Sequence, residues 1–272
     1  MPLYQAVVLA VVQGLTEFLP VSSTAHLILF PMLLHWEDPG LTFDVALHAG
    51  TLVAVLLYFW KMWLELLASA VGRGNSGAAT MIENRRLFWF LVAGTIPGGI
   101  AGYLLERAAE DEFRTPLVIG LAMILVAVLM WLGERITSTK SHLQNVSFID
   151  AMVVGVAQAF AVIPGVSRSG VTMTAGLFRG LNRETTARFS FLLSTPLIAG
   201  AVMKKGLEIR HEGIPLDMRM PFIVGVIVSG LVGYLVIGVL IRYLEVRTFK
   251  IFVVYRLALG VLVLALGWGL RH

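Results

Sequence analysis

The chain alternates long apolar windows with short polar stretches. Six windows stay apolar for about 20 residues, the length that an α-helix needs to cross ~30 Å of hydrocarbon. The pattern therefore predicts an all-α, polytopic membrane protein with six transmembrane helices. We expect these helices at residues 41–63, 86–106, 115–136, 186–205, 220–243 and 249–270.

Two further apolar regions are interrupted in the middle by proline and small polar residues. Residues 3–35 contain PVSST and residues 149–180 contain PGVSRSG, and each apolar half is too short to cross a bilayer. Non-helical backbone is tolerated at membrane depth only where it is buried in protein or lines a wet cavity. The interruptions therefore predict two re-entrant helical hairpins.

The two interrupted regions resemble each other. A shift of 145 residues places Gln13 on Gln158, and the same shift brings Ser22 onto Ser167. Each half of the chain then holds one hairpin that returns to its own side, followed by three spans, so the second half must begin on the opposite face of the membrane. The sequence predicts two inverted-topology repeats.

The repeats set the expected domain organisation. We predict a single membrane domain over 1–272, with a first repeat at 1–136 and a second, inverted repeat at 149–272. Paired interrupted segments at corresponding positions of two such halves point to a binding site near the bilayer midplane. We expect the two hairpin turns to meet there.

Composition supports a membrane protein. Hydrophobic residues make up 57% of the 272 residues, charged residues make up 14%, and the mean hydropathy is +0.83. Basic cytoplasmic loops explain the net charge of +4, so we expect no nucleic-acid partner. The chain has no cysteine, which excludes disulfides and thiolate metal ligands.

The loops predict the orientation. Twelve Lys and Arg residues fall on the face that receives Lys61 and Arg73, and seven fall on the other face. Cytoplasmic loops carry the excess of Lys and Arg. We therefore expect the first face to be cytoplasmic, with both termini and the mouth of the first hairpin on the outer side.

The first hairpin carries a polar cluster. Gln13 and Glu17 are four residues apart, so both project from one face of a helical arm. Ser22, Ser23 or Thr24 can then cap the next helix, which leaves backbone N–H groups directed at the turn. His26 follows within one helical turn of these hydroxyls.

The second hairpin has the composition of an oxyanion site. Gly165, Ser167, Arg168 and Ser169 stand at a predicted helix start, with Thr172 one turn further on. Helix N-termini, backbone N–H groups and a guanidinium are the donors that bind phosphate. Together the hairpins predict a phosphate-binding pocket.

Plainer interpretations stay open for several of these residues. Glu17 and Arg168 could form a structural ion pair, and the hydroxyls could bond back to their own helices. Asp44 and His48 share a helix face near the outer end of the first span, where a solvated or supporting role is as open as a catalytic one. At the membrane interface we expect Glu106, Arg188 and Arg256, by snorkelling.

The motifs QGLTEFLPVSSTAH, FDVALHAGTLVAVLLYFW, PGVSRSGVTMTAG and ARFSFLLSTPLIAGA resemble, along nearly the full chain, the undecaprenyl-diphosphate phosphatases, integral-membrane enzymes associated with bacitracin resistance. The family motifs read (E/Q)xxxE followed by PVSSTGH, and PGxSRSxxT. Gln13 stands where many members carry Glu, and Ala25 where Gly is usual. The family's functional positions fall here on Gln13, Glu17, Ser23, His26, Ser167, Arg168, Ser169 and Thr172.

The resemblance implies an activity and a location. It implies hydrolysis of the C55 carrier undecaprenyl diphosphate to undecaprenyl phosphate and inorganic phosphate, on the outer face of the bacterial cytoplasmic (inner) membrane. The monophosphate returns to peptidoglycan synthesis. The expected partners are this polyprenyl diphosphate lipid and the membrane lipids, and a homodimer is left open.

The hypothesised mechanism assigns roles to these residues. Ser23 attacks phosphorus while His26 takes its proton, and Glu17 orients His26 or, with Gln13, binds a Mg²⁺ or Ca²⁺ ion. Two rival schemes make His26 the nucleophile or use metal-activated water. The diphosphate is expected to be held by Arg168 together with Ser22, Thr24, Gly165, Ser167, Ser169 and Thr172.

A different class of function also fits the pattern. Inverted repeats with paired interrupted segments are typical of transporters, so the chain could be a transporter or flippase of an isoprenyl phosphate or another anionic solute. The cluster of Glu17, Ser23, His26 and Arg168 favours the phosphatase, because it is more reactive than binding alone requires.

Overall fold

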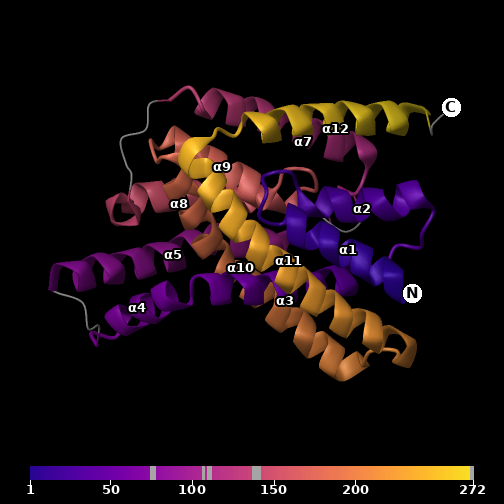
Figure 1. Ribbon diagram of the computed structural model, residues 1–272, viewed down its shortest axis with the longest axis horizontal. Coiled ribbons are helices and arrows are strands. Elements are labelled where there is room, and N and C mark those ends of the chain that lie inside the picture. Colours follow the sequence, from indigo (N-terminus) through magenta and orange to yellow (C-terminus); the bar gives the residue numbers. More distant parts are fainter. Residues whose placement is uncertain (74–77, 106–107, 109–111, 137–141, 270–272) are drawn as a thin grey trace.

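The computed structural model describes residues 1–73, 78–105, 108, 112–136 and 142–269, and all regular elements in these ranges are helices (Figure 1). Six of the described helices are long and apolar enough to cross a membrane. They are α3 (Leu41–Tyr58), α5 (Ala78–Leu104), α7 (Pro116–Gly133), α10 (Arg183–Glu212), α11 (Arg219–Val246) and α12 (Lys250–Gly269). The expected all-α, multi-pass membrane class is confirmed.

The remaining described elements are shorter. They are α1 (Leu3–Thr16), α2 (Ser23–Leu34), α4 (Trp60–Ala70), η1 (Leu143–Asn145), α8 (Phe148–Ala159), η2 (Phe160–Val162), α9 (Arg168–Phe178) and η3 (Leu216–Met218). One expected boundary is wrong. The apolar window 41–63 ends as a helix at Tyr58, and α4 starts anew at Trp60 after Phe59 leaves helical geometry.

Other boundaries differ at the polar ends of the spans. The window expected at 186–205 forms a helix from Arg183 to Glu212, because the flanking Arg, Lys and Glu residues have high helix propensity outside the hydrocarbon. Hydropathy predicts only the part of a helix that lies in the hydrocarbon, and the helix can continue beyond this part at both ends.

Both interrupted regions form helical hairpins. The helix pair α1 and α2 approaches from the end of the bundle that holds both termini, and the pair α8 and α9 approaches from the other end (Figure 1). Their turns meet inside the bundle. The helices also begin at corresponding positions, Leu3 with Phe148 and Ser23 with Arg168, which agrees with the expected repeat. The depth of the turns in a bilayer and the repeat limits 1–136 and 149–272 stay predictions.

The long helices form a close-packed frame around the turns. In this frame α11 packs on α3 and α1, α12 packs on α7, and α5 packs on α8. Glycines allow the closest of these approaches. A Cβ on Gly155 would lie 2.2 Å from the carbonyl oxygen of Gly94, and one on Gly50 would lie 2.2 Å from that of Val226. Small residues let membrane helices approach closely, so the hairpins are held by a rigid scaffold.

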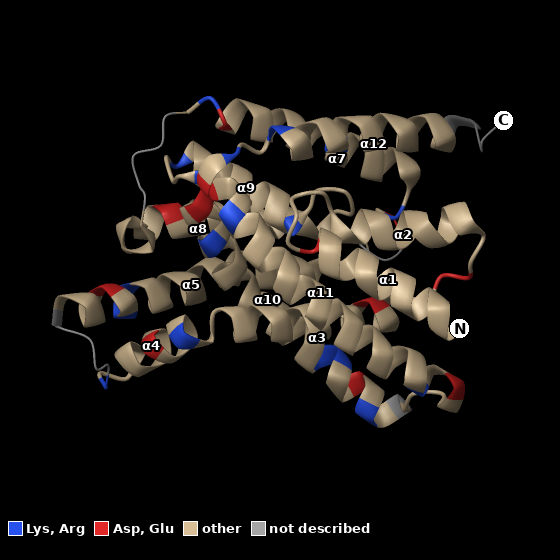
Figure 2. Ribbon diagram, viewed as in Figure 1, with Lys and Arg blue, Asp and Glu red and all other residues tan. Residues whose placement is uncertain are grey.

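Charged residues lie mostly toward the two ends of the bundle (Figure 2). The interior between these ends is apolar, with Phe18 of the first turn packed edge-to-face on Phe191 of α10 at 5.3 Å between ring centroids. Buried charges inside this frame are costly and mark function by default. Buried charges of this kind include Glu17 in the first hairpin turn and Arg256 on α12.

Candidate active site

Both hairpin turns enter their second helix through a serine in an unusual backbone conformation. Ser22 has φ 77° and Ser167 has φ 68°, and each is the N-cap of the helix that follows. Their hydroxyls accept from the backbone N–H groups of Ala25 at 3.3 Å and Gly170 at 3.1 Å. Positive φ at residues other than glycine is uncommon and costs free energy, and it clusters at functional sites.

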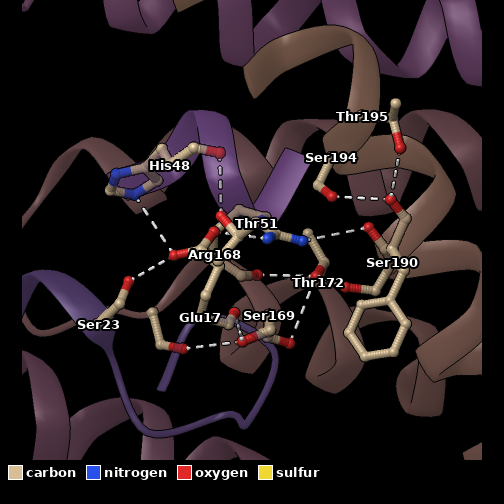
Figure 3. Close-up of polar contacts among 12 residues, drawn as sticks. Glu17, Ser23, His48, Thr51, Arg168, Ser169, Thr172, Ser190, Ser194 and Thr195 are labelled. Carbon is tan, nitrogen blue, oxygen red and sulfur yellow. Dashed lines mark hydrogen bonds and ion pairs between the residues drawn. The ribbon is translucent and has the colours of Figure 1, made fainter. Parts of the chain in front are cut away.

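The two turns are joined by a buried ion pair. Arg168, the first residue of α9, donates from Nη2 to Glu17 Oε1 at 2.8 Å (Figure 3). Only 5% of the Glu17 side chain and 11% of the Arg168 side chain is exposed. The Nη1 atom of Arg168 also donates to the carbonyl oxygen of Ser190 on α10 at 3.4 Å. The acidic and basic halves predicted from the two motifs therefore meet in one site.

The second oxygen of Glu17 receives three further contacts. Ser23 Oγ donates to Glu17 Oε2 at 2.7 Å, and Gln13 Nε2 donates to it at 3.0 Å. His48 Nε2 lies 3.3 Å from the same oxygen. Because its hydrogen points at a carboxylate, Ser23 Oγ keeps its lone pairs free. The geometry is one in which a carboxylate can accept the proton of a hydroxyl.

His26 faces away from Ser23 and toward α12. Its Nδ1 lies 2.6 Å from the carbonyl oxygen of Ser22 and its Nε2 lies 2.6 Å from the hydroxyl of Tyr255. A carbonyl can only accept, so Nδ1 carries a proton and donates it. In the described part of the chain no hydrogen bond joins His26 to Ser23. The expected Ser23–His26 pair is not formed in this conformation.

His48 reaches the site from α3. Its Nδ1 donates to the carbonyl oxygen of Asp44 at 2.7 Å, so Nε2 and Glu17 Oε2 hold one proton between them. The sequence left a supporting or catalytic role open for His48. Only its position on one helix face with Asp44, in the FDVALHAG motif, pointed to the site. The structure brings it into direct contact with the carboxylate.

The hydroxyls of the second hairpin bind protein groups. Ser169 Oγ donates to the carbonyl oxygens of Glu17 and Leu19 at 3.2 and 3.0 Å, which ties α9 to the first turn. Ser167 Oγ lies 3.3 Å from Ser169 Oγ. Ser169 therefore joins the second hairpin to the first, whereas the hydroxyl of Ser167, among the described residues, bonds only within its own turn.

The hydroxyls of Thr172 and Thr24 make no hydrogen bond to the carboxylate of Glu17 in the described part of the chain. Thr172 Oγ1 donates to the carbonyl oxygen of Arg168 at 2.7 Å and lies 2.6 Å from Ser190 Oγ, which places α9 against α10. Thr24 is half-buried in the first turn of α2. Gly165 has φ 93° and an added Cβ would lie 2.5 Å from the carbonyl oxygen of Ile119, so the turn requires glycine there.

Gln13 provides a test of the expected divalent cation. Its side chain is fully buried, and its Oε1 has no hydrogen-bond partner. No group of three or more His, Cys, Asp or Glu side chains suited to a metal is found among the described residues. Mg²⁺ in proteins often takes one or two carboxylates and completes its shell with water and substrate phosphates. The site fits a cation only if a bound phosphate compound supplies most of its ligands.

One expected interface residue lies elsewhere, since the Arg256 side chain is fully buried in the core. Its expected place at the membrane interface is therefore wrong, because its guanidinium binds backbone carbonyls of the hairpin turns. Arg188 is 31% exposed and pairs with Glu184. Glu106 lies outside the described residues.

A family model described as "Bacitracin resistance protein BacA" matches residues 6–262, a range that includes both hairpin turns. The chain belongs to the BacA family. It is 49% identical over 267 residues to an undecaprenyl-diphosphatase of Pelotomaculum thermopropionicum, covering 98% of this chain and 97% of that protein. It is 48% identical over 269 residues to an undecaprenyl-diphosphatase of Moorella thermoacetica, covering 98% and 99%. The similarity to BacA proteins thus extends over the whole site and its frame.

Proposed function

We propose that this chain hydrolyses undecaprenyl diphosphate to undecaprenyl phosphate and inorganic phosphate. Membership of the BacA family and the names of its relatives support this activity. The observation that carries the proposal is the buried contact of Glu17 with both Ser23 and Arg168. It sets a nucleophile, a proton acceptor and an anion-binding guanidinium within one site.

Substrate binding uses the donors gathered at the two helix starts. The guanidinium of Arg168 and the free N–H groups at the beginnings of α2 and α9 hold the diphosphate. Thr24, Ser169 and Thr172 help to shape this phosphate-binding site. The isoprenyl chain stays in lipid beside the apolar helices. Most of the rate enhancement comes from these fixed charges and dipoles.

The chemical steps begin at Ser23. Its Oγ attacks the terminal phosphorus, its proton passes to Glu17 Oε2, and the bond from phosphorus to the bridging oxygen breaks. Undecaprenyl phosphate leaves and a phosphoserine remains. Water then attacks this ester and the bond from phosphorus to Ser23 Oγ breaks; Glu17 returns its proton to Ser23 Oγ, and inorganic phosphate leaves with the protons of the water. In the rival schemes, His26 is the nucleophile or water attacks directly.

The 2.7 Å contact between Ser23 and Glu17 supports Glu17 as the first proton acceptor, in place of the His26 expected from the motif. A Mg²⁺ or Ca²⁺ ion would be held by Glu17 and the free Oε1 of Gln13, and would neutralise charge on the diphosphate.

The proposed setting is the bacterial inner membrane. Both termini and the mouth of the first hairpin lie on the outer side, as the loop charges indicate. Hydrolysis there returns the lipid carrier for peptidoglycan synthesis.

Phosphate release by the purified protein tests the proposal. Detergent-solubilised chain is mixed with undecaprenyl diphosphate, and inorganic phosphate is measured with and without Mg²⁺, Ca²⁺ and chelator. The Ser23→Ala variant is the control for contaminating phosphatases. If liposomes show lipid or solute flux and the protein releases no phosphate, the proposed phosphatase function is wrong and a transporter or flippase function takes its place.

A further inference from the structure

Arg256 is the largest fully buried side chain of the described residues, with 0% exposure. No carboxylate forms an ion pair with it in the described part of the chain. A buried charge is costly unless other groups satisfy it. Its hydrogen bonds must therefore supply what an acidic partner would have supplied.

Those hydrogen bonds all run to backbone carbonyl oxygens from three separate segments. Nη1 donates to Pro20 at 3.2 Å, in the first hairpin turn. Nη2 donates to Gly165 at 2.8 Å and to Val166 at 3.1 Å, in the second hairpin turn. Nε donates to Met123 of α7 at 3.3 Å. One planar group thus binds both turns and the frame at once.

The bound carbonyls of the two turns stand one or two residues before the strained caps. Pro20 lies two residues before Ser22, and Val166 immediately precedes Ser167. The guanidinium presents its donors in a fixed fork, so it sets the spacing of the groups that it binds. Its contacts therefore hold both turns where their caps keep positive φ.

We propose that Arg256 is a positioning residue that holds the two hairpin turns in register, so that Ser23 and Arg168 both reach Glu17. It does not touch these three side chains by any described hydrogen bond, and it acts through the backbone. The effect on turnover rests on the proposed phosphatase function. The effect on the distance between the turns does not.

Kinetics of Arg256→Met give the first test. Methionine keeps much of the side-chain length and removes all five donors. A displacement of about 1 Å between reacting groups lowers the rate by up to about a hundredfold. We therefore expect kcat to fall at least about tenfold and KM to change by no more than about threefold. Arg188→Met is the matched control, and it should stay within about twofold of the parent.

Distance measurement gives the second test and needs no activity. The chain has no cysteine, so spin labels can be attached at Leu15→Cys and Phe160→Cys, exposed residues that precede the two turns. Electron spin resonance should give a narrow distance distribution in the parent. The distribution should broaden or shift with Arg256→Met and stay unchanged with Arg188→Met.

Chemical rescue separates a specific role from general damage. Adding guanidinium to Arg256→Ala should restore part of kcat and narrow the distance distribution, with no gain for Arg188→Ala. If Arg256→Met does not fold, Arg256→Lys replaces it, and its ammonium should leave kcat and distance between those of parent and Arg256→Ala. Parent-like values in both measurements for the folded variant overturn the proposal. A parent that releases no phosphate refutes the phosphatase, while the distances still decide the role of Arg256.

Discussion

At the scale of single residues, the site depends on how Glu17 divides its two oxygens. One oxygen binds Arg168 of the other hairpin, and the second binds Ser23, with Gln13 and His48 beside it. The carboxylate therefore joins the two turns through one oxygen and, in the proposed mechanism, accepts the Ser23 proton through the other.

Arg168→Lys should lose most activity although it keeps the charge. An ammonium is a point charge and cannot bind phosphate with two parallel donors while it also contacts Glu17. One charge-assisted hydrogen bond contributes about 1.5–3 kcal/mol, so kcat/KM should fall at least about tenfold. Initial rates of phosphate release measure this. Near-normal turnover would leave Arg168 with a structural role only.

Ser23→Ala and His26→Ala should differ in severity. If Ser23 attacks, its loss abolishes turnover, whereas His26→Ala leaves a slower reaction, because His26 bonds Ser22 and Tyr255 and not the nucleophile. A trapped phosphoenzyme gives the direct measurement, since a phosphoserine resists acid and a phosphohistidine is acid-labile. An acid-labile adduct that disappears in His26→Ala would assign the attack to His26.

Gln13→Glu should make the reaction more dependent on a divalent cation. Gln13 Nε2 lies 3.0 Å from Glu17 Oε2, so the substitution sets two carboxylates against each other in a buried site. A cation bridging them relieves the repulsion. Activity should fall more steeply with chelator in the variant than in the parent and recover with added Mg²⁺. Equal chelator resistance in both proteins would argue against a metal at Gln13 and Glu17.

At the scale of elements, the sequence predicted the helices but not how they pack against one another. Hydropathy located all six spans, and the interruptions PVSST and PGVSRSG located both hairpins. The two hairpin motifs also predicted that Glu17, Ser23 and Arg168 lie in one site. The contact of His26 with Tyr255 and the burial of Arg256 were not predicted. Both depend on how α12 packs against the hairpins, which the local periodicity of the sequence does not encode.

Gly165→Ala should destabilise the second turn. The residue has φ 93°, and an added Cβ would lie 2.5 Å from the Ile119 carbonyl oxygen. Strain of this kind costs about 1–3 kcal/mol, so both thermal stability in detergent and turnover should fall. Gly99→Ala is the matched control, because no atom lies within 4 Å of its added Cβ. Equal melting temperatures for the two variants would contradict the close packing of the turn on α7.

At the scale of the whole molecule, the frame brings together hairpins that enter from opposite ends (Figure 1). The expected inverted order of elements agrees with this arrangement. The placement of each end inside or outside the cell comes from the loop charges, because the packing of helices is the same in either orientation.

Cysteine labelling tests that orientation. Glu37→Cys, in the segment between α2 and α3, should react with a membrane-impermeant maleimide added to intact cells, and Arg73→Cys, after α4, should react only after the cells are opened. Both positions are exposed, and the parent has no cysteine to give background. The reverse labelling pattern would show that the orientation is opposite to the one proposed, with the mouth of the first hairpin on the cytoplasmic side.

The joining of the turns through Ser23 and Arg168 bears on how such a protein could arise. These two residues occupy equivalent places in the two halves, one a hydroxyl and the other a guanidinium, and both bind the single carboxylate of Glu17. If the halves descend from one duplicated ancestral segment, two identical copies inserted in opposite directions would have carried the same side chain at both places. The nucleophile and the phosphate-binding residue of the proposed mechanism could become different side chains only after both copies were fused in one gene and free to mutate independently.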